Sequence, residues 1–259
     1  MLRMPNANVQ NSFTGKIALV SGASKGLGKS MALALSSNGA TVALVSRDRE
    51  KLDHVKGEIE SSGGTAAVFV ADITQEEDVQ RLGSEVSARL GKVQILINNA
   101  GTNIRKNLID FSLAEWRTVM DTNLTSVFLM CRAFVPHMLG TGYGRILNMS
   151  SIMSHISLPG RSAYSSSKAA LLGLTRALAL ELASEGITVN GISPGPFATD
   201  MNLPVIENPE ANAQFLANIP VGKWGKVEDI GTLAAYLCSE AAGFITGTDI
   251  LIDGGWCAR

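Results

Sequence analysis

Little in this sequence serves to cross-link a chain or to bind a metal. The 259 residues include only three cysteines, Cys131, Cys238 and Cys257, which are odd in number, widely separated and without a CxxC pair. This pattern argues against a disulfide framework and against a zinc site. We therefore expect no metal, and we interpret the three thiols as small buried apolar residues.

Strong charge and long hydrophobic runs are also lacking. The 22 basic and 23 acidic residues give a formal net charge of −1 and form no basic stripe, so neither nucleic acid nor a membrane is an expected partner. The apolar stretch 169–182 is interrupted by Arg176 and Glu181 and is shorter than the roughly 20 residues of a membrane span. Residues 1–14 lack the apolar segment of a signal peptide. We predict a flexible N-terminal arm over 1–14 and a cytoplasmic protein that acts on a small molecule.

The chain does contain a regular alternation of apolar strands and helices. Its content of hydrophobic residues is 46%, and no linker or repeat divides it, so residues 15–259 are expected to form one domain. Continuous apolar runs predict strands buried on both faces at 17–20, 41–45, 67–70, 95–97, 145–149, 188–192 and 249–252. The alternation predicts a single-domain α/β Rossmann fold, a doubly wound parallel sheet with helices on both faces, whose ligands lie at the carboxyl ends of the strands.

A glycine-rich turn, SGASKGLG at 21–28, follows the first predicted strand and opens the first predicted helix, which runs over 28–37. Gly22 permits a sharp turn, and Gly26 and Gly28 permit a pyrophosphate to approach the backbone closely. The helix N-terminus adds free N–H groups and a partial positive charge. The motif predicts a dinucleotide site, and the alternative is an ordinary glycine-rich turn.

Cofactor choice is predicted from the end of the second strand, where an acidic residue would bind the ribose 2′-hydroxyl of NAD. The chain has Ser46 and Arg47 there. The planar guanidinium of Arg47, with Lys25 from the glycine-rich turn, suits a 2′-phosphate. NADP(H) is therefore preferred. NAD(H) stays an alternative, because both cations could be ordinary surface charges and Asp48 could turn toward the ribose.

These motifs together resemble the short-chain dehydrogenase/reductase family. SGASKGLG resembles its TGxxxGxG motif with Ser21 in place of Thr, and the similarity continues through NNAG at 98–101, Asn123, Ser151, YSSSK at 164–168, PG at 194–195 and DGG at 253–255. The resemblance spans nearly the whole chain after residue 14. It implies an NADP-dependent oxidoreductase that interconverts a ketone and a secondary alcohol, as a homotetramer or dimer.

The resemblance implies a catalytic set of Asn123, Ser151, Tyr164 and Lys168. Tyr164 and Lys168 lie four residues apart at a helix start and therefore project from one face. A phenol with a pKa of about 10 is a poor acid at neutral pH, and a nearby ammonium draws that pKa down, so we expect Lys168 to tune Tyr164. By resemblance, Lys168 also binds the nicotinamide ribose, Ser151 holds the substrate oxygen and Asn123 extends a water relay. Ser150 is adjacent, but the spacing to Tyr164 favours Ser151.

The predicted dinucleotide contacts extend from the glycine-rich turn to the segment after the sixth strand. They are Gly22, Ser24, Lys25, Gly26, Leu27, Gly28, Ser46, Arg47, Asp72, Ile73, Asn99, Ala100, Gly101, Tyr164, Lys168, Pro194, Gly195 and Thr199. The resemblance implies that Asp72 belongs to the adenine pocket and that Thr199 contacts the carboxamide.

Substrate residues form no strict motif, and the candidates are Arg105, His155 and Phe197, with 197–218 as a substrate loop or lid. The segments 99–105, 223–225 and 253–259 resemble gluconate and deoxygluconate dehydrogenases, which implies a sugar acid or similar polar keto substrate. Arg105 would clamp its carboxylate, although Arg105 and His155 are equally typical of a surface charge and a loop histidine.

Two other functions stay open. The segments 186–190 and 245–247 echo 3-oxoacyl-carrier-protein reductases, although the sequence shows only a weak basic face for an acidic carrier. A dinucleotide-binding protein without turnover is a more distant alternative, against which the intact catalytic set argues. The reaction direction and the stereochemistry at the carbonyl are not predicted.

Overall fold

Seven parallel strands form the central sheet of the computed structural model, which describes residues 12–199 and 202–258. They are β1 (Ile17–Ser21), β2 (Thr41–Ser46), β3 (Thr65–Val70), β4 (Ile95–Asn98), β5 (Gly144–Met149), β6 (Ile187–Pro194) and β7 (Asp249–Ile252). Their order across the sheet is β3-β2-β1-β4-β5-β6-β7. All seven predicted strands are confirmed, because a strand that is buried on both faces needs apolar side chains at successive positions.

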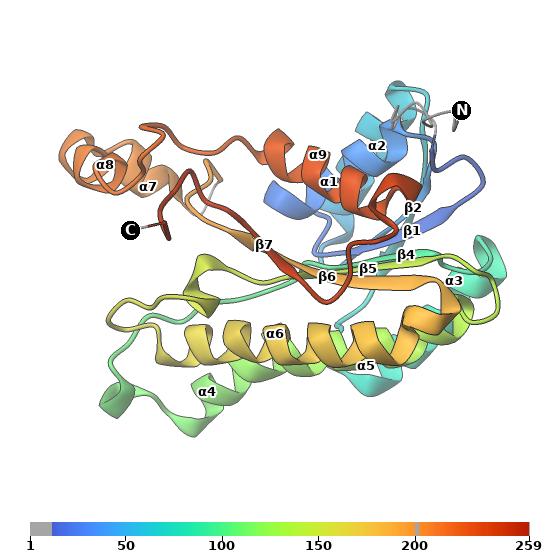
Figure 1. Ribbon diagram of the computed structural model, residues 1–259, viewed down its shortest axis with the longest axis horizontal. Helices are drawn as coiled ribbons and strands as arrows, with labels where there is room; N and C mark the ends of the chain where they lie inside the picture. Colours follow the sequence, from blue (N-terminus) through green and yellow to red (C-terminus); the bar gives the residue numbers. More distant parts are fainter. Residues whose placement is uncertain (1–11, 200–201, 259) are drawn as a thin grey trace, which may run out of the picture.

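Helices cover both faces of the sheet, as predicted (Figure 1). One face carries α1 (Gly26–Ser37), α2 (Arg49–Ser61) and α9 (Val227–Cys238); the other carries α3 (Glu76–Arg89), α5 (Ser126–Phe134) and α6 (Ser162–Leu182), with α4 (Leu113–Met120) beside α6. A separate hydrophobic cluster fills each of the two interfaces between sheet and helices. The doubly wound Rossmann fold is therefore confirmed.

The chain reverses its direction of winding at β1, which lies between β2 and β4. Connections leave β1 toward β2 on one side and return to β4 on the other. In such sheets, ligands bind outside the carboxyl ends of the strands at this switch point. The turn between β1 and α1 opens at that position.

Two short helices, α7 (Leu203–Ile206) and α8 (Pro209–Leu216), occupy the predicted substrate loop and lie near the C-terminus (Figure 1). Phe215 of α8 stacks on Trp224, with ring centroids 4.8 Å apart and planes 3° apart. The same ring lies 5.1 Å from that of Trp256. Aromatic contacts thus attach the loop to the C-terminal segment.

The domain begins earlier than the predicted boundary at residue 15. Residues 1–11 of the predicted arm lie outside the described residues, but Phe13 is fully buried in the core and its N–H donates to the carbonyl of Asn38 at 3.0 Å. The prediction of an arm over 12–14 is wrong, because an aromatic ring at position 13 belongs to the hydrophobic cluster beside α1.

Two of the three cysteines are buried, as expected, and Cys257 is partly exposed. Over the described ranges, every helix is too short or too polar to cross a membrane. The same residues contain no group of three or more His, Cys, Asp or Glu side chains arranged to hold a metal ion.

Candidate active site

The glycine-rich turn is shaped to receive a pyrophosphate. A Cβ at Gly28 would lie 2.2 Å from the carbonyl oxygen of Gly22, and one at Gly22 would lie 2.9 Å from Cα of Ala100, so neither position accepts a side chain. Helix α1 begins at Gly26, and no side chain caps it at Lys25. Its first N–H groups are therefore available to phosphate oxygens, and the turn fits the diphosphate of a dinucleotide.

Ser21, the residue that replaces the family's threonine, connects this turn to the one after β4. Its hydroxyl accepts hydrogen bonds from the N–H groups of Asn99 at 3.0 Å and Ala100 at 3.2 Å. In return, the Asn99 amide donates to the carbonyl oxygens of Ser21 at 3.0 Å and Gly22 at 3.1 Å. Asn99 was predicted to contact the cofactor, and the structure places its side chain in the support of the turn.

The end of β2 carries a cation whose side chain is mostly exposed. Asp48 caps α2 by accepting from the N–H of Lys51 at 3.1 Å, and the hydrogen bonds of Lys51 lower the pKa of the Asp48 carboxyl. Arg47 is 80% exposed and lies 3.9 Å from the carboxylate of Asp72. Asp72 itself accepts from the backbone and hydroxyl of Thr74. The cation, and not the acid that follows it, is thus the side chain offered to a ligand at β2.

Tyr164 and Ser151 meet at the carboxyl end of β5. Tyr164 lies in the first turn of α6, and its hydroxyl hydrogen-bonds Ser151. Ser151 caps the short 3₁₀ helix η4 (Ile152–Ser154) and accepts from the N–H of Met153 at 3.1 Å. Ser150 points elsewhere, because its hydroxyl donates to the carbonyl of Lys168 at 3.1 Å. The structure therefore orients Ser151 toward the tyrosine, as the spacing indicated.

Lys168 is buried beneath Tyr164, and its ammonium donates to the carbonyl of Met149 at 2.6 Å. Burial lowers the pKa of Lys168 to about 8. Burial also raises the pKa of Tyr164, against the opposing effects of the Ser151 hydrogen bond and the charge of Arg161. The Lys168 ammonium lies 5.8 Å from the ring centroid of Tyr164, and the Arg161 guanidinium carbon lies 5.9 Å from it. The expectation that Lys168 draws down the pKa of Tyr164 stays a prediction.

Asn123 joins this group from a π-helical turn, η2 (Asp121–Thr125). Its side chain is fully buried, accepts from the N–H of Thr102 at 2.7 Å, and donates to the Thr102 carbonyl at 2.9 Å and the Ser167 hydroxyl at 3.0 Å. A Cβ at Gly101 would lie 3.3 Å from the Asn123 oxygen and 3.5 Å from the Lys168 nitrogen. Asn123 and Lys168 therefore both lie against the turn after β4.

Comparison with known proteins supports the same assignment. A family model described as enoyl-(acyl carrier protein) reductase matches residues 22–257. The chain belongs to the short-chain dehydrogenase/reductase family. It is accordingly an oxidoreductase that acts on CH–OH groups with a nicotinamide dinucleotide.

Relatives of two kinds are similar in this short-chain dehydrogenase/reductase family. Gluconate 5-dehydrogenase of Gluconobacter oxydans is 36% identical over 244 residues, 94% of this chain and 95% of that protein. The 3-oxoacyl-[acyl-carrier-protein] reductase FabG of Haemophilus influenzae is 36% identical over 241 residues, 93% and 98% of the two chains. A crystal structure of a gluconate 5-dehydrogenase from Burkholderia cenocepacia, in complex with NADP and tartrate, has a TM-score of 0.91 at 30% identity and covers 97% and 99% of the chains.

The substrate candidates lie in three different surroundings. Arg105 is exposed. His155 hydrogen-bonds the carboxylate of Asp249 at 2.7 Å, and the same oxygen accepts from the hydroxyl of Ser193 at 2.6 Å. Phe197 is 4% exposed and packs on Gly225, where a Cβ would lie 2.6 Å from the ring. Asp249 is a site residue that the sequence did not reveal, because an acid in an apolar edge strand has no local signal of its partner.

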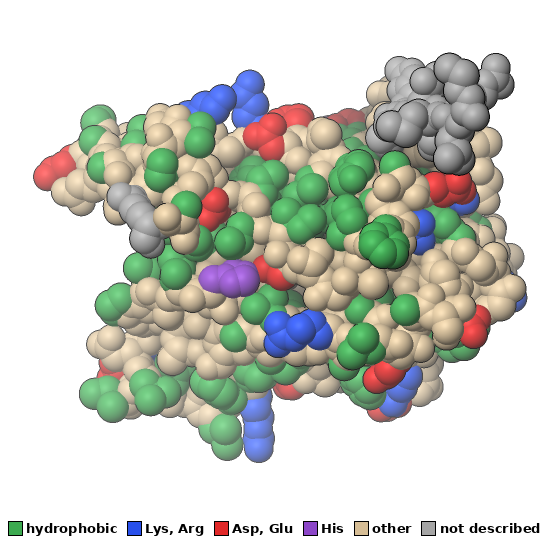
Figure 2. Space-filling model, viewed as in Figure 1, with side chains coloured by type: hydrophobic (Ala, Val, Ile, Leu, Met, Phe, Trp, Pro, Cys, Tyr) green, Lys and Arg blue, Asp and Glu red, His purple; other side chains and the backbone are tan. Residues whose placement is uncertain are grey.

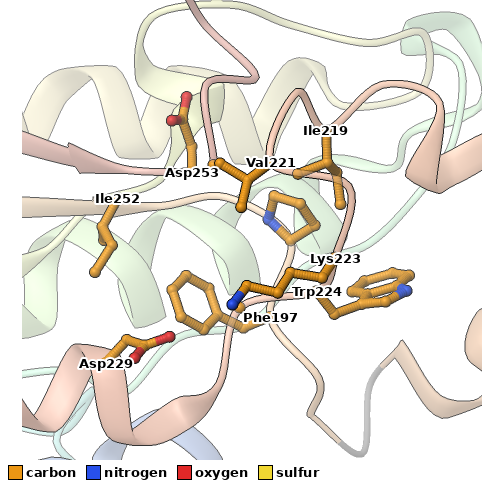
Figure 3. Close-up of a pocket in the computed structure, with 11 residues that line it drawn as sticks. Phe197, Ile219, Val221, Lys223, Trp224, Asp229, Ile252 and Asp253 are labelled. Atoms are coloured by element: carbon orange, nitrogen blue, oxygen red, sulfur yellow. The ribbon is translucent and has the colours of Figure 1, made fainter.

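Phe197 lines a cavity of about 110 Å³ together with Ile219, Val221, Trp224 and Ile252 (Figure 3). The cavity lies between the loop that carries Ile219 to Trp224 and the end of β7. None of the four catalytic candidates lines it. It is therefore separate from the place where Tyr164 meets a substrate oxygen.

The remaining predicted cofactor residues are distributed along the carboxyl ends of the strands. Thr199 passes over the glycine-rich turn, where its methyl group lies 3.9 Å from the Cβ position of Gly26. Gly195 is required by packing, because a Cβ there would lie 2.6 Å from that of Asp253. Ser24 and Leu27 lie in or next to the glycine-rich turn, Ser46 ends β2, Ile73 follows β3 and Pro194 ends β6.

Proposed function

We propose that this enzyme reduces the ketone of a short polar keto acid, of the sugar-acid type, with NADPH, or catalyses the reverse oxidation. The observation that carries the proposal is the attachment of the loop that carries Arg105 to the segment that precedes the proton donor Tyr164. The N–H of Lys106 donates to the carbonyl of Gly160 at 3.2 Å, so the loop with Arg105 is fastened to the loop that leads into Tyr164. A guanidinium there suits a substrate carboxylate, whose two oxygens it can bind in parallel.

The four catalytic residues have different roles in the reaction of the substrate ketone. The hydroxyls of Ser151 and Tyr164 hold the substrate oxygen, and Tyr164 transfers a proton to it. The bound nicotinamide supplies or accepts the hydride. Lys168 offers its ammonium from beneath the phenol, and Asn123 fixes the turn at Thr102 with both ends of its amide. The water relay implied for Asn123 stays a prediction.

Arg47 supports the preference for NADP(H). It stands at the end of β2 with 80% of its side chain exposed, while Asp48 is engaged by α2. We expect Arg47→Ala to weaken NADPH binding by about 1.5–3 kcal/mol, the usual contribution of a charge-assisted hydrogen bond, and to leave NADH binding nearly unchanged. Fluorescence titration with both cofactors measures this, and the exposed neighbour Arg49→Ala serves as the control. Equal losses for both cofactors would contradict the assignment.

The substrate class is tested with two ketones that differ in charge alone. 5-Keto-D-gluconate carries a carboxylate, and L-sorbose has the same chain with a hydroxymethyl group instead. We expect the wild type to prefer the acid and Arg105→Ala to lower kcat/KM for it by about ten- to hundredfold, with little effect on L-sorbose. The exposed Arg117→Ala is the matched control.

A wild-type enzyme without any preference for the acid would refute the keto-acid proposal. High activity on a 3-oxoacyl thioester would favour the acyl reductase alternative, which the FabG relative supports. Cofactor binding without turnover of any carbonyl substrate would favour the non-catalytic alternative.

We also propose a homo-oligomer, a dimer or tetramer. The edge strand β7 exposes Leu251, α9 exposes Tyr236 and the nearby Phe244 is fully exposed. Figure 2, which views this edge, shows a surface with many hydrophobic and few charged side chains. Light scattering after gel filtration tests the proposal, and Leu251→Lys should shift the protein toward a smaller species.

We keep the cytoplasm as the proposed location, which cell fractionation tests.

A further inference from the structure

A second arginine stands next to the proton donor. Arg161 directly precedes α6, is half-buried, and its guanidinium carbon lies 5.9 Å from the ring centroid of Tyr164. The hydrogen bond between Lys106 and Gly160 joins the immediate neighbours of Arg105 and Arg161 along the chain. The two guanidinium groups are thus brought within Coulombic range of each other by main-chain atoms.

Neither guanidinium is neutralised. Within residues 12–199 and 202–258, the side chains of Arg105 and Arg161 form no ion pair and no hydrogen bond, whereas the adjacent Lys106 is paired with Glu115. Burial, and then the charge of Arg105, lower the pKa of Arg161. Arg161 is half-buried and Arg105 is exposed. Two like charges held close together repel each other unless an anion lies between them.

We propose that Arg161 is the second arm of a clamp in which it and Arg105 bind one substrate carboxylate, and that this clamp selects short keto acids. The inference rests on the proposed function and assigns the residue that sets its specificity. Because Arg161 stands beside the Tyr164 ring, an anion held there lies only a few bonds from the carbonyl that Tyr164 protonates. A 3-oxoacyl thioester offers no anion at that distance.

The clamp also acts on the proton donor. The charge of Arg161 lowers the pKa of Tyr164 against the larger opposing effect of burial. A bound carboxylate neutralises part of that charge, so it raises the pKa of the phenol and keeps it protonated until it transfers its proton. Substrate binding and proton donation are coupled through this one side chain.

The test measures ligand binding in the complex with NADP⁺, in which no reduction takes place. Calorimetry with 5-keto-D-gluconate and L-sorbose compares the wild type with Arg105→Ala, Arg161→Ala, Arg161→Lys, the double alanine variant and Arg176→Ala, an exposed cation on α6. We expect each alanine variant to bind the acid at least tenfold more weakly, and Arg161→Lys to recover part of the loss. Because both arginines hold one carboxylate, the double variant should lose less than the product of the single losses. Arg176→Ala should match the wild type.

Different results overturn different statements. If Arg161→Ala and Arg161→Lys bind the acid as tightly as the wild type while Arg105→Ala does not, the second arm is refuted and the proposed function stands. If the wild type does not distinguish the acid from L-sorbose, the proposed function fails and the clamp fails with it. A second readout is the pH dependence of L-sorbose reduction, whose upper limb should move to higher pH in Arg161→Ala. An unmoved limb would refute the coupling to Tyr164.

Discussion

The surroundings of Tyr164 have opposing effects on the pKa of its phenol. Burial alone would make the phenol a weaker acid, while Ser151 and Arg161 oppose that effect. A proton donor that remains protonated at neutral pH, and whose hydroxyl lies beside a second hydroxyl able to hold the substrate oxygen, is suited to ketone reduction. The side chains that achieve this come from both ends of the segment between β5 and α6.

Replacement of this phenol isolates its role. Tyr164→Phe should lower kcat by about 10²–10⁴-fold, the usual contribution of a positioned acid, because the ring stays and only the proton is lost. NADPH binding should change little, since the glycine-rich turn is untouched. Steady-state kinetics and cofactor titration measure the two quantities. Retention of most of the activity would show that another group supplies the proton.

We predict that the buried ammonium of Lys168 lowers the free energy of unfolding of the protein, although its proposed role in the reaction requires it. In the folded protein its pKa is about 8, against 10.5 for a free side chain. Below pH 8 the lysine is charged in both states and the folded state bears the unfavourable burial of the ammonium. Between about pH 8 and 10.5 the unfolded state binds more protons, so the free energy of unfolding rises with pH and the penalty disappears.

Lys168→Met should therefore abolish activity and raise the free energy of unfolding at pH 7 by about 1–3 kcal/mol, less whatever the lost bond to Met149 contributed. The gain should shrink as the pH approaches 10.5. Urea denaturation at pH 7 and pH 10 measures both values, with the exposed Lys92→Met as the control. A gain that is constant with pH would show that burial of the charge is not its cause.

Secondary structure elements differ in how far the sequence reveals them. The strands were predicted because a continuous apolar run reports its own burial. The turn after β1 was predicted because Gly22 and Gly28 answer local steric demands. The π-helical turn at Asn123 was not, since one additional residue in a helix leaves the apolar period nearly unchanged.

Contacts between distant elements were missed for a different reason. His155 and Asp249 are 94 residues apart, and they meet because β5, which precedes His155, pairs with β6 and β6 pairs with β7. Arg161 is different, because a cation three residues before the predicted catalytic Tyr164 was visible and only its orientation was lacking. The core of the site was thus predictable, and its specificity residues were not.

The bond between His155 and Asp249 fastens the loop after Ser151 to the edge of the sheet. The Asp249 carboxylate also holds Ser193, whose hydroxyl lies 3.0 Å from the Ser151 carbonyl oxygen. Asp249→Ala should lower the free energy of unfolding by about 1–3 kcal/mol and reduce kcat, because a buried hydroxyl and an imidazole lose their acceptor. NADPH affinity should change less than kcat, because the glycine-rich turn lies at the end of β1, and β4, β5 and β6 separate β1 from β7.

A double-mutant cycle with His155→Ala checks this contact. We expect a coupling free energy of about 1 kcal/mol from urea denaturation, the range for directly bonded side chains. Additive effects would mean that His155 contributes nothing through Asp249.

At the scale of the whole domain, Phe13 is buried in the hydrophobic cluster beside α1 and so attaches the N-terminal segment to the core. Phe13→Ala should lower the free energy of unfolding by about 3–5 kcal/mol, because it leaves a cavity the size of a phenyl ring in the core. The fully exposed Phe244→Ala should change it by less than about 0.5 kcal/mol. A small effect at Phe13 would show that the core does not depend on this segment.

At the scale of the molecule, the site is assembled from turns at the ends of several strands while the sheet stays fixed. The hydrogen bond from Lys106 to Gly160 uses main-chain atoms only, so it does not depend on the side chains at 105 and 161. The side chains at 105 and 161 can therefore be replaced while the hydrogen bond between their loops is kept. This holds provided that Gly160, with φ of +75°, remains glycine. A lineage, or a library randomised at these two codons, can explore new substrates without rebuilding the proton-transfer group.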